Sequence, residues 1–184
     1  MVYNTILDAI GHTPMIRLNR LSEPDAAQIL VKYEGVNIGG SIKTRTAYNM
    51  LKRAEENGLI NENTIIVEPT SGNQGIGLAL VGAVKGYKIK IIMPDSVSEE
   101  RRKLVKNYGA EVILIHDDGN IGKCIEECME TAKRMAAEDP NVYPASLRTP
   151  IIPKRTSTTP QPRYLNRLAA ILTDFAAAWA RAAQ

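Results

Sequence analysis

The chain has 184 residues, with 23 basic and 20 acidic side chains and 44% hydrophobic residues. This composition is too apolar for a disordered chain, and a net charge of +3 gives no reason to expect a nucleic-acid partner. No apolar run approaches the roughly 20 residues of a membrane-spanning helix, so no membrane partner is expected. Two cysteines and the lack of a charged-then-apolar leader predict a reduced, cytoplasmic setting.

Residues 1–11 read as a short helix, and strands are expected at 14–18 and 28–33, with a loop over 22–25 between them.

From Ser41 onward, helical segments alternate with short β-branched runs, a pattern typical of βα units that build a parallel sheet. The strands are nearly continuously apolar, as strands covered on both faces tend to be. Ser96 followed by Glu99 matches a capping box and indicates a helix start. The expected fold is therefore α/β, a twisted parallel sheet with flanking helices. Its helices are Ser41–Asn57, Asn73–Lys85, Ser98–Tyr108 and Ile121–Glu138, and its strands are Thr64–Glu68, Lys88–Met93, Glu111–Ile115 and one from Asn141.

Composition changes near Tyr143. Residues 1–143 hold 17 basic and 19 acidic side chains, whereas residues 144–184 hold 6 and 1, so the excess positive charge belongs to the tail. Five of the ten prolines also lie in the tail, which predicts a Pro-rich linker over 144–162. Residues 163–184 repeat apolar side chains at intervals of three and four and predict an amphipathic helix. That helix could pack on a nearby apolar surface or associate with itself.

A glycine-rich loop follows the first strand of the predicted sheet. It runs T-S-G-N-Q-G-I-G from Thr70 to Gly77 and opens a helix. Free amides at a helix start bind anions, and glycines let a ligand approach the backbone. The glycine order is not that of the dinucleotide fingerprint, and no G-K-[ST] follows, so a nucleotide is not indicated. The polar side chains suit a carboxylate; the alternative is a turn needed only to pack the helix on the sheet.

Lys43 follows a second small-residue turn, Gly39-Gly40-Ser41, also at a predicted helix start. The helix dipole opposes a positive charge there, and a lysine so placed can serve as a nucleophile toward a carbonyl cofactor. The alternative is an ordinary solvated surface lysine. Cys124 and Cys128 lie four apart on one helix, and with so few further ligands nearby they predict a packing pair rather than a metal site.

Three strings in register resemble one family: I-G-H-T-P-M-I-R-L at 10–18, the stretch 32–45 ending in N-I-G-G-S-I-K-T-R, and E-P-T-S-G-N-Q-G-I-G-L-A at 68–79. They are similar to the cysteine synthase and cystathionine β-synthase group of pyridoxal-phosphate enzymes, which have the tryptophan-synthase-β fold. The resemblance runs from about Asn4 to Tyr143. Residues after Tyr143 are expected to be unrelated to the family.

The resemblance implies pyridoxal 5'-phosphate as cofactor and a role for each matching residue. Lys43 would form the internal aldimine and later move the α-proton, and Asn73 would hydrogen-bond the ring hydroxyl of the cofactor. The carboxylate of an amino-acid substrate would be held by Thr70, Ser71, Gly72 and Gln74. No metal site is implied. The implied reaction is a β-replacement on an activated serine, such as O-acetylserine, with sulfide or a thiol, to give cysteine or a related amino acid.

The resemblance also divides the chain. Residues 1–40 would be part of an incomplete large domain with the loop leading out of it, and 41–143 would be the small domain. Strands left exposed by this division could pair with a second copy, so a homodimer is the one macromolecular partner left open.

The sequence departs from the family at several positions. Ile38 replaces a usual proline, Thr44 a usual aspartate and Gln74 a common threonine, which leaves the leaving group and nucleophile open. No glycine follows Gly122, so the family's glycine-rich phosphate loop is missing from these 184 residues. The alternative function is therefore a truncated, catalytically silent remnant or an interaction module of the same family.

Overall fold

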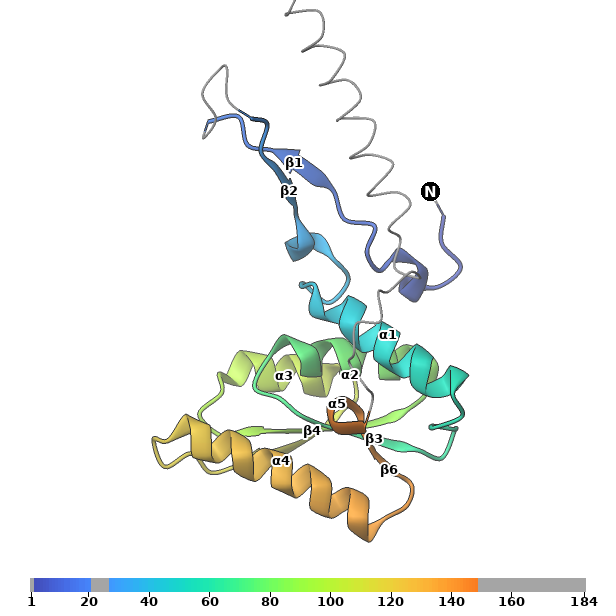
Figure 1. Cartoon of the computed structure of the whole chain (residues 1–184), viewed down its shortest axis with the longest axis vertical. Helices are drawn as coiled ribbons and strands as arrows, with labels where there is room; N and C mark the ends of the chain where they lie inside the picture. The colour runs from blue at the N-terminus through green and yellow to red at the C-terminus, as the bar shows by residue number, and fades with distance from the viewer. Residues whose placement is uncertain (1, 21–26, 149–184) are drawn as a thin grey trace, which may run out of the picture. The chain divides into compact units, whose positions relative to one another are not determined.

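The structure is a computed structural model that describes residues 2–20 and 27–148 (Figure 1). Its centre is a four-stranded, wholly parallel sheet in the order β5-β4-β3-β6, which confirms the predicted α/β fold. The strands are β3 (Ile65–Pro69), β4 (Lys88–Pro94), β5 (Glu111–Ile115) and β6 (Val142–Pro144).

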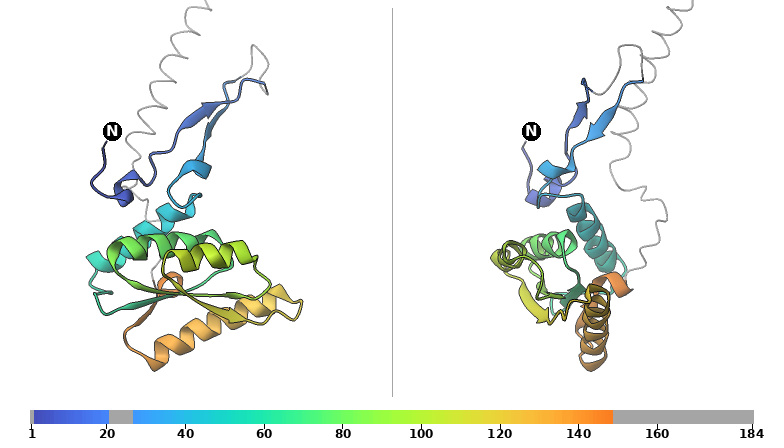
Figure 2. Two further views of the ribbon diagram at one scale, coloured as in Figure 1. Left: turned by 180° about the vertical axis from the view of Figure 1, so that it is seen from behind. Right: turned by 90° about the vertical axis from the view of Figure 1, so that its left-hand side faces the viewer.

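Helices cover both faces of the sheet, as the two views in Figure 2 show. One face carries α1 (Lys43–Glu56), α2 (Asn73–Lys85) and α3 (Glu99–Asn107), and the other carries α4 (Ile121–Glu138). Adjacent strand residues point to opposite faces: Ile66 lies in the core under α1 and α2, and Val67 in the core under α4, each 0% exposed. This two-sided burial explains the continuous apolar runs in the sequence.

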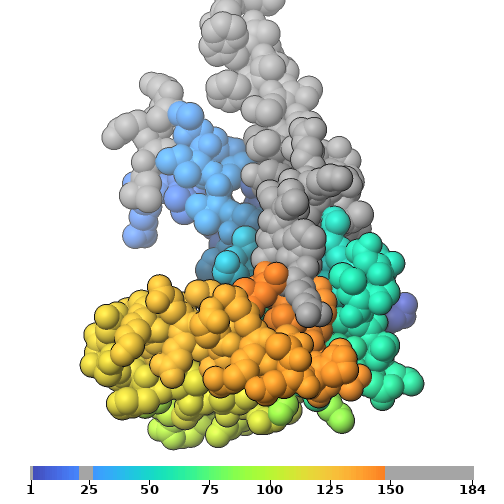
Figure 3. Space-filling model, turned by 60° about the horizontal axis from the view of Figure 1, so that its bottom comes forward, coloured from blue at the N-terminus to red at the C-terminus, as the bar shows by residue number. Residues whose placement is uncertain are grey.

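The α4 core contains both cysteines. Cys124 and Cys128 are buried, free thiols that pack with Val67, Ile92 and Ala132, so the predicted packing pair is confirmed. Burial raises the pKa of the Cys128 thiol to about 12, because a thiolate would be poorly solvated there. Figure 3 shows α4 lying across this face of the molecule.

The N-terminal elements are shorter than predicted. The helix expected over 1–11 is wrong in length and type: only Ile6–Ala9 forms a helical turn, η1, of the 3-10 kind. Thr5 and Asp8 cap this turn reciprocally, which satisfies its first amides without a further turn. The expected strands shrink to β1 (Met15–Arg17) and β2 (Leu30–Lys32), which pair antiparallel, and another 3-10 turn, η2, covers Glu34–Val36. The loop expected over 22–25 lies outside the described residues.

The predicted capping box at Ser96 is wrong. The hydroxyl of Ser96 donates to Asp117 Oδ2 at 2.6 Å, and α3 instead begins after Ser98, which occupies the N-cap position. Ser96 follows β4 and Asp117 follows β5, so the parallel pairing of these strands brings a charged acceptor within reach of the hydroxyl. Ser96 thus lies two residues before the N-cap, and its hydroxyl makes a charge-assisted bond with Asp117.

Regular structure continues past the predicted start of the linker. Pro144 ends β6, and Ala145–Arg148 form a short helix, α5. Pairing of β6 with β3 and the hydrogen bond from Ser146 N to Glu68 Oε2, at 2.9 Å, hold this segment on the sheet. The rest of the linker, to residue 162, and the amphipathic helix predicted over 163–184 lie outside the described residues. Within the described ranges, no helix is long and apolar enough to cross a membrane.

Helices α1 and α2 approach each other most closely at Gly77. A Cβ atom added there would lie 3.1 Å from the carbonyl oxygen of Lys43, and equally near Thr44 Cα and Ala47 Cβ. Two of these three atoms belong to the backbone of α1, so they cannot turn aside as a flexible side chain could. The absence of a side chain at Gly77 therefore sets the distance between the two helices.

Replacing Gly77 with Ala should destabilise the protein by roughly 1–3 kcal/mol, because α1 must move away to admit the methyl group. Urea denaturation measures the free energy of unfolding. The matched control is Gly122→Ala in α4, where the added Cβ meets its nearest neighbour, Asn120 Oδ1, at an ordinary 3.5 Å. The control should be stabilised by up to about 1 kcal/mol through helix propensity. Equal stability of G77A and the unchanged protein would contradict this account of the packing.

Candidate functional site

The strand order places one loop at a favoured binding position. From β3 the chain adds β4 and then β5 on one side, but β6 pairs on the other side of β3. Ligands of open α/β sheets bind at such a reversal, outside the carboxyl ends of the strands. The loop that leaves β3 there is Thr70-Ser71-Gly72, which runs directly into α2.

This loop, with the first turn of α2, forms what we call the anion loop, residues 70–74. Gly72 occupies the N-cap position of α2, and no side chain caps the helix. The amide of Thr70 is bonded to Ile92 O and that of Gly72 to Thr70 Oγ1. Within the described residues, no hydrogen bond is found for the amides of Ser71, Asn73 and Gln74. The predicted cluster of free donors at a helix N-terminus is therefore present.

The side chains of the anion loop are arranged unequally. Asn73, the first residue of α2, is exposed. Gln74 turns toward α1, and its Nε2 lies 3.3 Å from Met50 Sδ. The backbone amide of Gln74 is thus free at the loop among the described residues. Its side-chain amide instead contacts a buried methionine of the neighbouring helix.

The glycines that follow also serve packing, the alternative considered for this motif. A Cβ on Gly75 would lie 2.9 Å from Thr70 Cγ2 and 3.0 Å from Ile91 Cγ2, and Gly77 admits α1 as described above. Gly72 differs, because the only atom within 4 Å of an added Cβ is Arg101 Nη1, at 3.9 Å. The motif therefore combines an open first glycine with two glycines required by close packing.

Arg101 is a residue of the site that sequence reasoning missed. Its Nη1 donates to the carbonyl oxygen of Ser71 at 3.2 Å, which ties α3 to the anion loop. No local pattern reveals this contact, since thirty residues separate the two positions.

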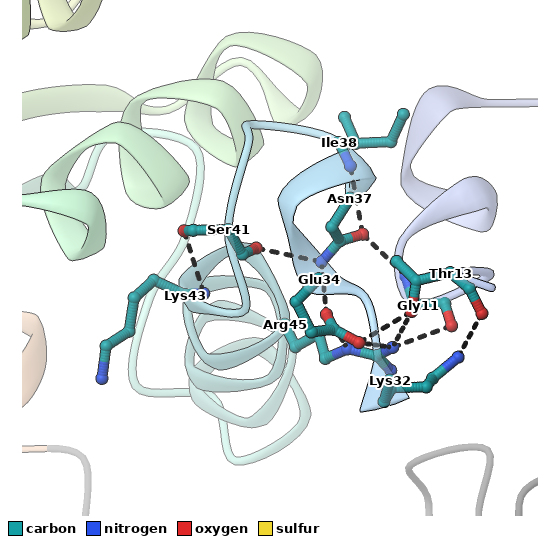
Figure 4. A network of polar contacts seen from close by, with 9 residues as sticks. All are labelled: Gly11, Thr13, Lys32, Glu34, Asn37, Ile38, Ser41, Lys43 and Arg45. Atoms are coloured by element: carbon teal, nitrogen blue, oxygen red, sulfur yellow. Dashed lines mark hydrogen bonds and ion pairs between the residues drawn. The ribbon is translucent and has the colours of Figure 1, made fainter. Parts of the chain in front are cut away.

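Lys43 is the first residue of α1, and its backbone lies beside α2. The amide of Lys43 donates to Ser41 Oγ at 3.2 Å, and its carbonyl oxygen faces Gly77, one turn beyond Asn73. The side chain is exposed rather than buried and extends away from the polar groups around Ser41 in Figure 4. Among the described residues it has no ion-pair partner. A free amine thus stands at the start of the helix that packs against the anion loop.

The segment before Lys43 is held by an ion pair. Arg45 Nε and Nη2 donate to the two carboxylate oxygens of Glu34, at 2.8 and 2.7 Å, and Nη2 also reaches Gly11 O at 2.8 Å. Thr13 Oγ1 donates to the same carboxylate at 2.7 Å. These contacts, drawn in Figure 4, fasten residues before β1 and after β2 to the first turn of α1.

Asn37 completes this network and shapes the turn before Lys43. Its Oδ1 accepts from the amides of Gly11 and Ile38, and its Nδ2 donates to Ser41 O and Glu34 Oε2. The buried amide is thereby fully bonded. The turn between Asn37 and Ser41 needs glycine, because Gly39 and Gly40 both have positive φ, 82° and 75°.

Thr44 shows the effect of one departure from the family pattern. The residue is 0% exposed, and its Oγ1 has no hydrogen-bond partner within the described residues. It faces Gly39, where an added Cβ would lie 2.5 Å from this oxygen. The hydroxyl that replaces the family's aspartate is therefore a buried polar group without compensation.

Replacing Glu34 with Gln should destabilise the protein by roughly 1–3 kcal/mol at pH 7, because Arg45 keeps a largely buried charge without its counter-ion. Burial acts to raise the pKa of Glu34, but hydrogen bonds from Arg45 and Thr13 outweigh it and hold the pKa below the usual 4.5. This contribution to stability is thus complete above pH 4.5 and is lost as the pH falls below that value.

Urea denaturation of both proteins at pH 7 and at pH 3 to 4 tests this dependence. The difference in unfolding free energy should shrink at the lower pH. Glu56→Gln is the control, since its pair with Lys52 is exposed and should contribute less than about 1 kcal/mol. A loss in E34Q no larger than in the control would show that the network does not anchor the segment.

Comparison with known proteins identifies the family. Residues 6–160 match the family model described as pyridoxal-phosphate dependent enzyme. A probable cysteine synthase of Bacillus subtilis is 47% identical over 143 residues, 78% of this chain and 44% of the relative. A cysteine synthase of Staphylococcus aureus is 39% identical over 164 residues, 89% of this chain and 52% of the relative. The chain thus spans about half the length of these relatives, and the family match extends past Tyr143, where we expected the resemblance to end.

Solved structures of related proteins support the same family. A hydrogen sulfide-producing enzyme from Fusobacterium nucleatum superposes with a TM-score of 0.70 and 41% identity, over 79% of this chain and 46% of that one. A lysine-to-alanine variant of O-ureido-L-serine synthase with O-ureido-L-serine bound has a TM-score of 0.67 and 39% identity, over 76% of this chain and 42% of that one. Since the family model covers most of this sequence, the chain belongs to the family of pyridoxal-phosphate dependent enzymes.

Proposed function

We propose that the protein takes part in a pyridoxal 5'-phosphate-dependent β-replacement, in which sulfide or a thiol displaces the leaving group of an activated serine such as O-acetylserine. The product would be cysteine or a related β-substituted alanine. The observation that carries the proposal is that Lys43, an exposed amine without an ion-pair partner among the described residues, and the anion loop lie on two helices in backbone contact.

The anion loop supports an amino-acid substrate. Three free amides at the positive end of α2, those of Ser71, Asn73 and Gln74, would receive the substrate carboxylate. The hydroxyls of Thr70 and Ser71 lie on the same loop and would add donors. Because Gly72 lacks a side chain and has open space around it, the carboxylate could approach the backbone there. Arg101 would keep the loop in place through Ser71 O.

Lys43 supports the carbonyl chemistry of the cofactor. Its amine is exposed and unpaired within the described residues, as a group that must react with an aldehyde requires. In the proposed reaction, Lys43 Nζ would hold the cofactor and then move the proton at the α-carbon of the substrate. Asn73, exposed at the start of α2, would donate to the ring hydroxyl. When bound, the cofactor supplies an electron sink for the α-carbon.

The residues present fit the aldehyde, the ring hydroxyl and the substrate carboxylate. The phosphate is different, since the sequence contains no glycine after Gly122, and we assign no residue to it. The names of two relatives, a probable cysteine synthase and a cysteine synthase, support a sulfur nucleophile. O-ureido-L-serine synthase is named for a product other than cysteine, so the nucleophile and the leaving group both need a direct test. Homodimerisation and a cytoplasmic location stay predictions.

Lys43→Ala should abolish the visible absorbance that pyridoxal phosphate acquires on the protein, because no amine remains at this position to hold the aldehyde. The test is to add the cofactor, dialyse and record the spectrum. Lys52→Ala is the control, since Lys52 is an exposed lysine of the same helix that pairs with Glu56. A protein-bound band that survives in K43A would refute the role of Lys43.

Adding O-acetylserine to the loaded, unchanged protein tests the reaction. A change in the absorbance band supports the proposed substrate class, and O-phosphoserine and serine test other leaving groups. A spectrum without any bound band, with the unchanged protein folded by circular dichroism, would instead support the silent or interaction-module alternative.

A further inference from the structure

Glu68 is a buried carboxyl group with no role in the proposed reaction. It is the fourth residue of β3, next to the anion loop, and only 3% of it is exposed. Alternation along the strand puts it on the same face as Ile66, under α1 and α2. That face is lined by apolar side chains, among them Met50 and Leu51 of α1.

Among the described residues, Glu68 hydrogen-bonds to the start of α5. The amide of Ser146 donates to Glu68 Oε2 at 2.9 Å, and the Ser146 hydroxyl also stabilises the carboxylate. No charged side chain of α1, α2, β4 or the other described elements contributes to its ionisation. The titratable neighbour on β6 is Tyr143, which is buried in the same core. Glu68 therefore ties two segments together without a counter-ion.

Burial of a carboxylate without a cation disfavours its charged form. This effect is larger than the stabilisation from Ser146, and burial raises the pKa of Glu68 from 4.5 to about 7. The contact between Glu68 and the segment that contains Ser146 is therefore favoured when Glu68 is neutral. If the segment lifted away, water would reach the carboxyl group and restore its ordinary pKa.

We propose that Glu68 is a proton-dependent latch: its neutral carboxyl group holds Val142–Arg148 on the sheet, and its ionisation loosens that segment. The segment is well placed to act as a movable part. β6 pairs with β3 through only three residues, at the edge of the sheet, and α5 contacts both β3 and α1. Loosening it would uncover the point of strand reversal beside the anion loop.

The pH dependence of docking follows from the raised pKa of Glu68. Docking is strongest below pH 4.5, where Glu68 is neutral in both the docked and the open segment. It weakens as the pH rises from 4.5 to about 7 and stays constant above that range. Because each pKa unit is a tenfold change in an equilibrium constant, the opening constant can rise by up to about 300-fold.

Hydrogen exchange with mass spectrometry tests the latch and needs no cofactor, so its outcome is independent of the proposed function. Exchange is measured at pH 5 and pH 8 and corrected for the intrinsic pH dependence of amide exchange. Protection of residues 142–148 should fall at least about tenfold at pH 8, whereas β4, in the centre of the sheet, should change much less.

Glu68→Gln keeps an acceptor for Ser146 N but cannot ionise, so its protection should be the same at both pH values. Glu62→Gln removes an exposed carboxylate and should behave like the unchanged protein. His116, whose pKa is raised by its hydrogen bond to Asp95, is retained in E68Q, so a pH dependence caused by His116 would persist in that variant.

The latch is refuted if the unchanged protein shows equal corrected protection of 142–148 at both pH values, or if E68Q loses protection as the unchanged protein does. Should E68Q not fold, the comparison of 142–148 with β4 in the unchanged protein still decides. A loss equal in both segments, or none in either, overturns the proposal.

Discussion

The described structure depends on the backbone contact between α1 and α2 at Gly77. Without a side chain there, the carbonyl oxygen of Lys43 lies against the helix whose first turn carries the anion loop. An exposed amine and a set of amides that are free among the described residues thus share one rigid support, although about thirty residues separate them in sequence. Functional groups placed on packed helices are held more firmly than groups on free loops. Gly77 permits the close packing of α1 and α2 that holds them.

Two carboxyl groups contact the segments on either side of this support, and their surroundings shift their pKa values in opposite directions. Glu34 is surrounded by the guanidinium of Arg45 and by hydroxyl and amide donors, so it is held as an anion and its pKa falls. Glu68 has one amide and one hydroxyl in an apolar core, so it is held in its neutral form and its pKa rises. Burial alone does not decide the charge of a carboxyl group; the donors around it do.

The order of strands and helices from Ser41 onward could be predicted because each strand is a short, nearly continuous apolar run and a glycine or proline closely follows each long helix. The positions of Lys43 and the anion loop followed from the same pattern. Contacts between distant residues could not be predicted: the hydroxyl of Ser96 bonds Asp117 rather than its own helix, and Ser146 finds Glu68 across 78 positions. The side chain of Gln74 likewise follows the packing of Met50 rather than the motif.

The end of the sheet at β6 bears on whether another chain can add a strand there. An exposed strand edge invites another chain to add a strand, and natural sheets suppress this with short strands and prolines. Here the edge strand has three residues, and the last, Pro144, has no amide hydrogen to offer. Its length and its proline make β6 a poor template for intermolecular pairing.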